Sequence, residues 1–404
     1  MRVLWFEVTV PKQFNPHGFQ GGGWQDALEQ IVRSRNDVEL GVAFENRNGS
    51  EEDKLVDNVH YFPLNTRYGI IDRVRDLFSW DVNREKLIPL ALKVIEDFKP
   101  DVIHVFGSEW CFGLLNEYIS IPVVIHMQGS IPPYNNAFYP PGYNEFDEAF
   151  YNLTHFKFSK LVMLPFLRLK RKDRQKQEER ILRGVRYFMI NLFNPTAKYF
   201  YWSEALRQSF VGSGKEWHSF KNSKVKLTTT GCSSLWKGID TIVRTSRLLK
   251  NSGFDFEWRL VGNLNHQGLI EWKEKEKMES LNITLMGMVD SNQLIDILID
   301  TDLYVHTAYI DNSPNSICEA QYLGVPIIAT YVGGIPSLIE NGRDGVLVPA
   351  NSPFTLAKEI INLSKDNKRK LMYSDNSKLR ARTRHDPSTI LSDLVQIYNT
   401  IREE

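Results

Sequence analysis

The sequence predicts an α/β protein with two Rossmann-like, doubly wound domains that face each other across a cleft. Short apolar runs alternate with stretches of helical periodicity, which is the pattern of parallel β-α-β units. The runs are apolar throughout, as expected when helices cover both faces of a sheet. With 404 residues the chain is also too long for one compact core.

The expected strands form one set in each half of the chain. In the first half they cover residues 3–10, 38–44, 59–64, 101–106, 123–126 and 198–201. In the second half they cover residues 226–230, 258–261, 283–286, 303–306, 327–329 and 346–348. Helical spacing marks residues 83–98 and 291–299. The polar stretch 209–223 separates an N-terminal domain, 1–210, from a C-terminal domain, 222–386.

Composition and charge exclude several classes of protein. The chain has 49 Lys and Arg against 49 Asp and Glu, so it offers nucleic acid no long-range attraction. Cys111, Cys232 and Cys318 lie far apart, which argues against a disulfide framework or a zinc site and favours a reducing, cytoplasmic compartment. Glu7 interrupts the first apolar run, so we expect a strand there and not a signal peptide.

One segment departs from the overall neutrality. Residues 157–186 contain eleven Lys or Arg against three Asp or Glu, an excess of eight positive charges. An apolar, aromatic run, 156–169, precedes and overlaps it. Two interpretations stay open for Phe156 to Arg186: a solvated helical face, or an amphipathic surface that docks on anionic lipid at the inner face of the cytoplasmic membrane.

The most informative stretch, 311–320, follows the expected strand 303–306 and opens a helix. A helix N-terminus offers free backbone N–H groups and the positive end of the helix dipole, and both suit anions and hydroxyl groups. Asp311 before the helix and Glu319 two turns inside it could both reach a polyhydroxylated ligand. The alternative is that Asp311 only caps the helix and Glu319 is solvated.

Other loops follow strands at their carboxyl ends, where parallel sheets bind ligands. Lys237 stands just before a helix and suits a diphosphate leaving group, although a lysine there can be a surface residue. Gly333-Gly334 would let the backbone approach a ligand, or forms an ordinary turn. The loop with Gly22 and Gly23 could pass close to phosphates or a sugar, or be merely flexible. His126 ends a strand and could exchange a proton near neutral pH.

Taken in order, these motifs resemble retaining glycosyltransferase family four, which has the GT-B fold. The resemblance is carried by the glycine loop, His126, the element 231–238, the stretch from Asp311 to Pro326, and the closing segment from Asn341 to Pro349. It covers residues 226–349 well, and the first half only through the loop, His126 and strand order. It also implies that a last helix, within 387–404, packs back on the first domain.

The resemblance implies a role for each site residue. Lys237 would hold the donor diphosphate, Glu319 the nucleotide ribose, and the backbone at Gly287 and Met288 the base. Asp311 would engage the donor sugar, and His126 would face the reacting sugar. The implied catalytic residues are His126, Asp311, Lys237 and Glu319. The implied donor site also includes Gly22, Gly23, Gly262, Asn312, Ser313, Pro314, Asn315 and Ser316.

The function implied is transfer of a sugar, with retention, from a nucleotide-diphosphate sugar to a glycan or lipid-linked acceptor in polysaccharide synthesis. No cofactor beyond this co-substrate and no metal is expected, because Asp300-Thr301-Asp302, the one D-x-D match, lies at the amino end of a strand. Three positions depart from the family pattern, namely Cys232 for arginine, Asp311 for glutamate and Ser337 for glutamate. A nucleotide-sugar epimerase and an inactive sugar-nucleotide-binding protein therefore stay open as alternatives.

Overall fold

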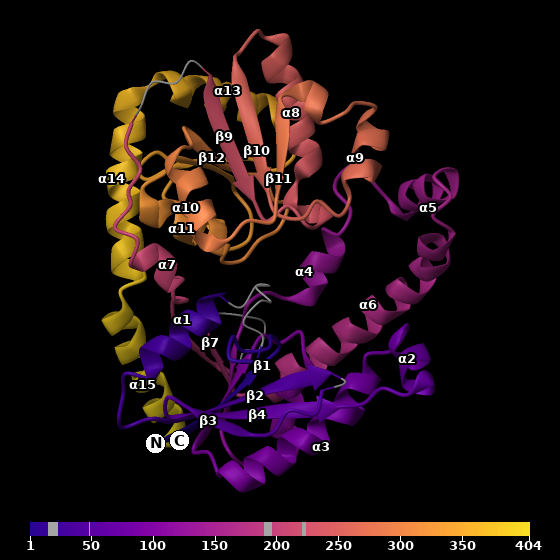
Figure 1. The fold of residues 1–404 in the computed structure, drawn as a ribbon, viewed down its shortest axis with the longest axis vertical. Helices are drawn as coiled ribbons and strands as arrows, with labels where there is room; N and C mark the ends of the chain where they lie inside the picture. Colours follow the sequence, from indigo (N-terminus) through magenta and orange to yellow (C-terminus); the bar gives the residue numbers. More distant parts are fainter. Residues whose placement is uncertain (15–22, 48, 190–195, 220–223) are drawn as a thin grey trace. The chain divides into compact units, whose positions relative to one another are not determined.

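The structure, a computed structural model, describes residues 1–14, 23–47, 49–189, 196–219 and 224–404. The chain divides into two compact units (Figure 1). The first contains Met1–Pro132, Val162–Arg207 and His385–Glu404, and the second contains Pro133–Leu161 and Gln208–Arg384. Each unit therefore includes a segment that is distant in sequence from the rest of it.

The described part of the first unit is built on an eight-stranded sheet with the strand order β3-β4-β2-β1-β5-β6-β7-β8. All neighbouring strands are parallel except β3 and β4. The sequence analysis missed β3 and β7, which have three residues each. The strands are β1 (Arg2–Glu7), β2 (Glu39–Arg47), β3 (Lys54–Val56), β4 (Val59–Thr66), β5 (Val102–Phe106), β6 (Val123–His126), β7 (Tyr187–Met189) and β8 (Lys198–Phe200).

Helices cover this sheet on both faces, in two separate apolar clusters. One cluster joins the sheet to α1 and α15, and the other joins it to α3, η1 and part of α6. The helices are α1 (Gly23–Val32), α2 (Ile70–Asp76), α3 (Asp81–Phe98), η1 (Cys111–Glu117), α6 (Phe158–Gly184) and α15 (Pro387–Arg402), with α4 (Ile131–Asn136) beginning at the edge of the unit.

The described part of the second unit has a six-stranded sheet with the order β11-β10-β9-β12-β13-β14. Every neighbouring pair is parallel. The order reverses between β9 and β12, which is the strand order of a Rossmann sheet. The fold class predicted from the sequence is confirmed. The strands are β9 (Val225–Thr230), β10 (Phe256–Val261), β11 (Ile283–Gly287), β12 (Leu303–His306), β13 (Ile327–Thr330) and β14 (Val346–Val348).

The central strands of this sheet are buried along their whole length, as in β12 and β13. The edge strand β11 differs, because four of its five residues are exposed. The helices are α5 (Glu145–Thr154), α7 (Gln208–Val211), η2 (Leu235–Lys237), α8 (Ile239–Asn251), α9 (Gln267–Glu274), η3 (Glu279–Leu281), α10 (Ser291–Ile299), α11 (Asn315–Leu323), α12 (Ile335–Leu338), α13 (Pro353–Lys365) and α14 (Asn367–Arg384).

Residues 133–161, which the sequence analysis places in the first domain, contact the second unit. Tyr143 donates a hydrogen bond to Glu274, and Asp147 forms an ion pair with Lys273 at 2.6 Å. Tyr151 packs against Trp272. These contacts join residues far apart in sequence, so no local sequence pattern predicts them.

Helix α15 is fixed in the first unit by a buried polar contact under β1. The indole Nε1 of Trp5 donates to the Tyr398 hydroxyl at 2.9 Å, and this hydroxyl lies 2.5 Å from Nδ1 of His104. All three side chains are buried. Among the described helices, none has both the length and the apolar content that crossing a bilayer requires.

We predict that Tyr398→Phe lowers the free energy of unfolding by about 2 kcal/mol, because it leaves the Trp5 N–H and the His104 nitrogen buried without this partner. Urea titration at neutral pH measures the change. The control is Tyr201→Phe, at an exposed tyrosine of the same unit. Equal unfolding midpoints for the two variants would contradict the prediction.

Candidate functional site

Two loops meet at the carboxyl edge of the second sheet, where its strand order reverses. One follows β9 and contains η2, and the other follows β12. Thr307 Oγ1 donates to the Lys237 carbonyl at 2.9 Å, and the Tyr309 N–H donates to the Trp236 carbonyl at 2.7 Å. Gly238 has φ of 75°, and a Cβ there would lie 2.0 Å from the Thr307 carbonyl oxygen. Only glycine lets the two loops approach so closely.

This contact brings together three ionisable side chains. Lys237 Nζ lies 2.6 Å from Asp311 Oδ2, and His306 Nε2 lies 3.0 Å from the same oxygen. Asp311 and His306 are buried, whereas Lys237 is partly exposed. A carboxylate oxygen can only accept, so Nε2 of His306 carries the proton in this contact.

Asp311 is held in its charged form. Burial by itself would raise its pKa, but the charge of Lys237 and the hydrogen bond from His306 outweigh burial and hold the pKa below its ordinary value. The site therefore presents a buried carboxylate whose charge is balanced mainly by one lysine.

Gly333 and Gly334, which follow β13, pack against the backbone of this site. A Cβ on Gly333 would lie 1.9 Å from the Asp311 carbonyl oxygen, and one on Gly334 would lie 2.1 Å from that of Asn312. The Gly334 N–H donates to the Asp311 carbonyl at 3.0 Å. The structure thus shows these glycines admitting the backbone of 311–312, whereas the sequence suggested the approach of a ligand.

Helix α11 begins beside the carboxylate. Its N-cap is Pro314, Asn312 and Ser313 form the bend before it, and Asn315 and Ser316 are the first two residues of the helix. The N–H of Asn312 donates to Asp311 Oδ1 at 3.2 Å. Glu319 is buried within this helix. It is therefore not the solvated residue that the sequence analysis kept as an alternative.

Three glycines with positive φ end neighbouring strands of the sheet. They are Gly231 after β9, Gly262 after β10 and Gly287 in β11. A Cβ at Gly231 or Gly287 would meet no atom of the described residues within 4 Å, so among these residues the backbone there is open to a ligand. Met288, next along the chain, has an exposed side chain.

Cys232 stands where the family resemblance leads us to expect arginine. Its side chain is buried, and its sulfur lies 3.9 Å from the Thr229 carbonyl oxygen. Burial raises its pKa to about 12 despite the nearby Lys237, so the thiol is neutral at physiological pH. Cys232 therefore supplies no positive charge for a diphosphate.

The residues expected in the first half lie in the first unit. Gly22 lies outside the described residues, and Gly23 is the first residue of α1. His126 ends β6 and is fully buried. Its ring contacts Trp24 and Trp202 edge to face, with centroids 4.9 and 5.0 Å away.

The environment of His126 changes its chemistry. Within the described residues neither ring nitrogen has a hydrogen-bond partner, and Glu204 Oε1 lies 4.0 Å from Nε2. Burial lowers its pKa to about 3. Burial therefore favours the neutral ring near physiological pH, and proton exchange by His126 stays a prediction.

The D-x-D match has a structural role at the other edge of the sheet. Asp300 forms ion pairs with Lys226 and Arg259 at 2.7 and 2.9 Å. Asp302 accepts from the Lys226 N–H at 2.9 Å. The described residues contain no group of three or more His, Cys, Asp or Glu side chains that could hold a metal ion.

Sequence reasoning missed His306 and Tyr309. His306 is the last residue of β12, as His126 is of β6, so the rule that singled out His126 applies to it equally. Tyr309 gave no signal, because its contacts come from α8 and η2, about seventy residues earlier in the chain.

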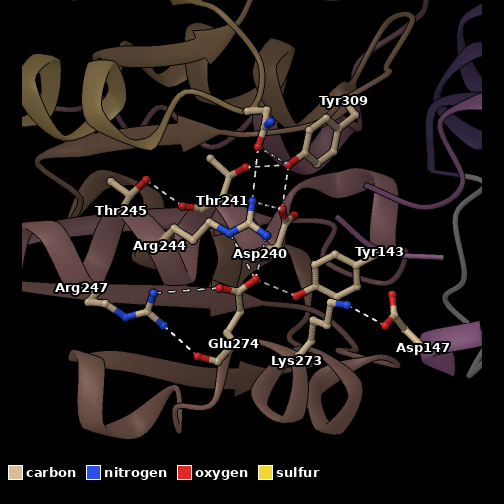
Figure 2. A network of polar contacts seen from close by, with 11 residues as sticks. Tyr143, Asp147, Asp240, Thr241, Arg244, Thr245, Arg247, Lys273, Glu274 and Tyr309 are labelled. Carbon is tan, nitrogen blue, oxygen red and sulfur yellow. Dashed lines mark hydrogen bonds and ion pairs between the residues drawn. The ribbon is translucent and has the colours of Figure 1, made fainter. Parts of the chain in front are cut away.

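A polar network extends from this site to the segment 133–161 (Figure 2). Tyr309 donates to Asp240 at 2.7 Å, and Arg244 lies between Asp240 and Glu274, to which Tyr143 also donates. Asp240 is buried, and its Oδ1 has no partner among the described residues. Burial raises the pKa of Asp240 to about 6, although the hydrogen bond from Tyr309 and the charge of Arg244 oppose the change.

The same segment contacts the loop of Lys237 through aromatic rings. Trp236 packs against Tyr134 and Phe138, with ring centroids 5.7 Å apart in both pairs. Residues 133–161 thus contact both ends of the second unit's candidate site, through Trp236 and through the network that ends at Tyr309.

Comparison with known proteins finds a family match over part of the chain. Residues 224–366 match the model of a family described as "Glycosyl transferases group 1". The capsular polysaccharide biosynthesis glycosyltransferase CapM of Staphylococcus aureus is 22% identical over 191 residues, which cover 47% of this chain and 50% of CapM. The chain spans half or less of the length of the first curated relatives it matches.

Solved structures are similar over the whole chain. Sucrose-phosphate synthase from Thermosynechococcus elongatus has a TM-score of 0.71 at 13% identity, covering 99% of this chain and 98% of that one. HepE of Anabaena in complex with UDP-glucose has a TM-score of 0.61 at 14% identity, covering 99% and 100%. At these identities the similarity shows the fold, two parallel α/β sheets as in GT-B glycosyltransferases.

We predict that Lys237→Met lowers the free energy of unfolding by about 1–3 kcal/mol at neutral pH, because the buried Asp311 carboxylate loses its charged partner. Since the folded-state pKa of Asp311 is lowered, its stabilising contribution exists above about pH 4 and disappears as the pH falls further. The cost of Lys237→Met should shrink over the same range.

Urea unfolding of Lys237→Met, Asp311→Asn and the double variant measures the coupling between the two residues. Lys250→Met, at an exposed position of α8, is the control. Additive effects of the two substitutions would show that the ion pair contributes nothing to stability.

We predict a distinct pH dependence for Asp240→Asn. The folded-state pKa of Asp240, about 6, lies above the value near 4 of an unfolded aspartate. The folded protein thus binds the extra proton, and wild type loses stability as the pH rises from about 4 to 6. Asp240→Asn cannot bind this proton, so its free energy of unfolding should lack this pH-dependent contribution, which amounts to at most about 3 kcal/mol.

The measurement is urea unfolding at a series of pH values, with Glu279→Gln, at an exposed carboxylate of the same unit, as the control. Parallel stability curves for wild type and Asp240→Asn between pH 4 and 6 would contradict the assigned protonation.

Proposed function

We propose, from the match of residues 224–366 to the model of a group 1 glycosyl transferase family, that the chain is a retaining glycosyltransferase of polysaccharide biosynthesis. It transfers a hexosyl group from a nucleotide-diphosphate sugar to a glycan or lipid-linked acceptor. The observation that carries the proposal is the meeting of Lys237, Asp311 and His306 where the strand order of the second sheet reverses. Sheets of this type bind nucleotides there.

Lys237 stabilises the leaving nucleotide diphosphate in this proposal. Its ammonium group has three N–H donors, so it can contact Asp311 and a phosphate oxygen together. Helix α11 begins beside it and adds the positive end of its dipole. A charge fixed in place before the reaction is an effective way to stabilise the charge that develops on the departing diphosphate.

The other residues bind the donor. The open backbone at Gly231 and Gly287 receives the nucleotide together with Gly262 and Met288, and Glu319 binds its ribose. Asp311 contacts the donor sugar. The sugar also contacts the backbone N–H groups of Asn312, Ser313, Asn315 and Ser316, while Pro314, which has no N–H, lies between them. UDP is the first nucleotide to test, because the HepE complex contains UDP-glucose.

The first unit supplies the acceptor side. His126 acts as a neutral ring that hydrogen-bonds to the reacting sugar, since its pKa of about 3 leaves it uncharged at physiological pH. In this proposal Gly22 and Gly23 also bind the donor. No metal takes part, because the fixed lysine and helix dipole provide the positive charge.

The reaction takes place in the cytoplasm, at the inner face of the membrane, where a lipid-linked acceptor would be presented. The segment Phe156 to Arg186 makes the peripheral contact in this proposal. Its excess of eight positive charges suits anionic headgroups, and the side chains of Phe156 and Phe158 are exposed.

UDP, GDP, ADP and CMP are each tested as ligands. We predict that one of the three diphosphates, UDP, GDP or ADP, raises the free energy of unfolding of wild type by roughly 2.7 kcal/mol at about 100 times its dissociation constant. Lys237→Ala and Glu319→Gln should lose this stabilisation, each compared with its own ligand-free form. Lys250→Ala, at an exposed lysine of α8, should keep it. Thermal unfolding measures the shift.

The same proteins are then incubated with the sugar derivative of the nucleotide that binds. Release of the nucleotide is measured with and without a cell extract that contains glycan or lipid-linked acceptors. Binding without release would favour the inactive sugar-nucleotide-binding protein, and conversion of the sugar without acceptor would favour the epimerase. No stabilisation by any nucleotide would remove the transferase proposal.

A further inference from the structure

Helix α2 of the first unit presents its apolar side to solvent. Ile70, Ile71 and Val74 are 82%, 75% and 53% exposed, and Leu77 and Phe78 in the following turn are also exposed. The spacing i, i+1 and i+4 places Ile70, Ile71 and Val74 on one side of the helix, and Leu77 and Phe78 continue this spacing in the turn after it. None of the residues of α2 is buried.

The polar side of α2 faces the protein instead. Asp72 forms an ion pair with Lys86 of α3 at 2.7 Å, and Arg75 forms one with Glu85 of α3 at 2.8 Å. Asp76 forms an ion pair with Lys170 of α6 at 2.9 Å. A surface helix of a soluble protein normally has the opposite orientation, with its apolar side on the core. Ion pairs therefore hold α2 in a position where its apolar side needs another partner.

The neighbouring helix α6 indicates which partner this is. The turn after α2 is fastened to it, because the Ser79 hydroxyl and the Trp80 N–H both donate to Asp173. In the part of α6 that precedes Asp173, the apolar residues Val162, Leu167 and Leu169 are exposed. Helix α6 also exposes the basic residues Arg168, Lys172 and Lys176.

Charge favours an anionic bilayer over another protein surface. Residues 157–186 have an excess of eight positive charges, and residues 67–78 have three Arg against two Asp, an excess of one. Because the formal charge of the whole chain is zero, the rest of the chain has a net charge of −9. Positive charge is thus concentrated beside an exposed apolar helix, a combination typical of elements that lie in the membrane interface.

We infer that α2 is a membrane-insertion element: its side formed by Ile70, Ile71, Val74, Leu77 and Phe78 enters the boundary between headgroups and acyl chains of an anionic bilayer. The basic residues of α6 lie over the lipid phosphates. The inference extends the proposed peripheral contact of Phe156 to Arg186, because it assigns insertion to α2 and electrostatic attraction to α6. It uses the proposed function only to explain why a lipid-linked acceptor would be accessible.

The test is flotation of the full chain with vesicles of phosphatidylcholine, alone or mixed with phosphatidylglycerol. The variant Ile70→Ser/Ile71→Ser should reduce binding to the mixed vesicles about tenfold at both low and high salt. The charge variant Arg168→Gln/Lys172→Gln/Lys176→Gln should reduce binding mainly at low salt, because salt screens its contribution in wild type. Neither of these two variants should change the shift in unfolding temperature that nucleotide causes. Failure of the membrane-insertion inference is therefore distinguishable from failure of the proposed function.

The matched control is Phe354→Ser/Leu379→Ser, which removes two apolar side chains of similar exposure, 75% and 71%, from the second unit. It should bind vesicles as wild type does. All three variants alter exposed side chains, and thermal unfolding verifies that they fold. Wild-type binding by Ile70→Ser/Ile71→Ser, or absence of wild-type binding to anionic vesicles, would overturn the inference.

Insertion itself can be followed with a label. Cys111, Cys232 and Cys318 are buried, so an environment-sensitive fluorophore attached to Ile71→Cys reports on one position. Its emission should shift to the blue with mixed vesicles, and that of a label at Phe354→Cys should not. If Ile70→Ser/Ile71→Ser instead converts a dimer into a monomer in gel filtration, the apolar side is a contact between copies and the inference fails.

Discussion

The candidate site depends on the close approach of two loops, one after β9 and one after β12. Gly238 makes the approach sterically possible, and hydrogen bonds from Thr307 and Tyr309 hold it. The approach places the ammonium of Lys237 2.6 Å from a buried carboxylate, and that carboxylate stays charged because Lys237 is there. The paired glycines after β13 then fit against the backbone of Asp311 and Asn312. Charge, backbone conformation and packing at this site therefore support one another.

The two units differ in how they use buried polar groups. In the second unit they form a connected network that runs from Tyr309 through Asp240, Arg244 and Glu274 to Tyr143. In the first unit His126 is enclosed by Trp24 and Trp202 and has no hydrogen-bond partner among the described residues. Burial without a hydrogen-bond partner disfavours the charged form of the ring, which is why the pKa of His126 is lowered.

The sequence could predict the site as a set of motifs, because ligand loops follow the carboxyl ends of parallel strands. That rule found Lys237, Asp311 and His126. It could not find the contact between Lys237 and Asp311, which are 74 residues apart, or the pKa of His126, which depends on burial. Gly333 and Gly334 were recognised as a place of close approach, but only the structure shows that the approaching group is the backbone of 311–312.

By itself the sequence determined the α/β class, the positions of most strands and the parallel arrangement of the strands except β3, because alternation of apolar runs and helical periods is a local property. Only the tertiary structure decided that Pro133–Leu161 belongs with the second unit and that α2 turns its apolar side outward. The physical reason is the same in both cases. Ion pairs and hydrogen bonds between residues distant in sequence, such as Asp147 with Lys273 and Asp76 with Lys170, decide which side of a segment faces the protein.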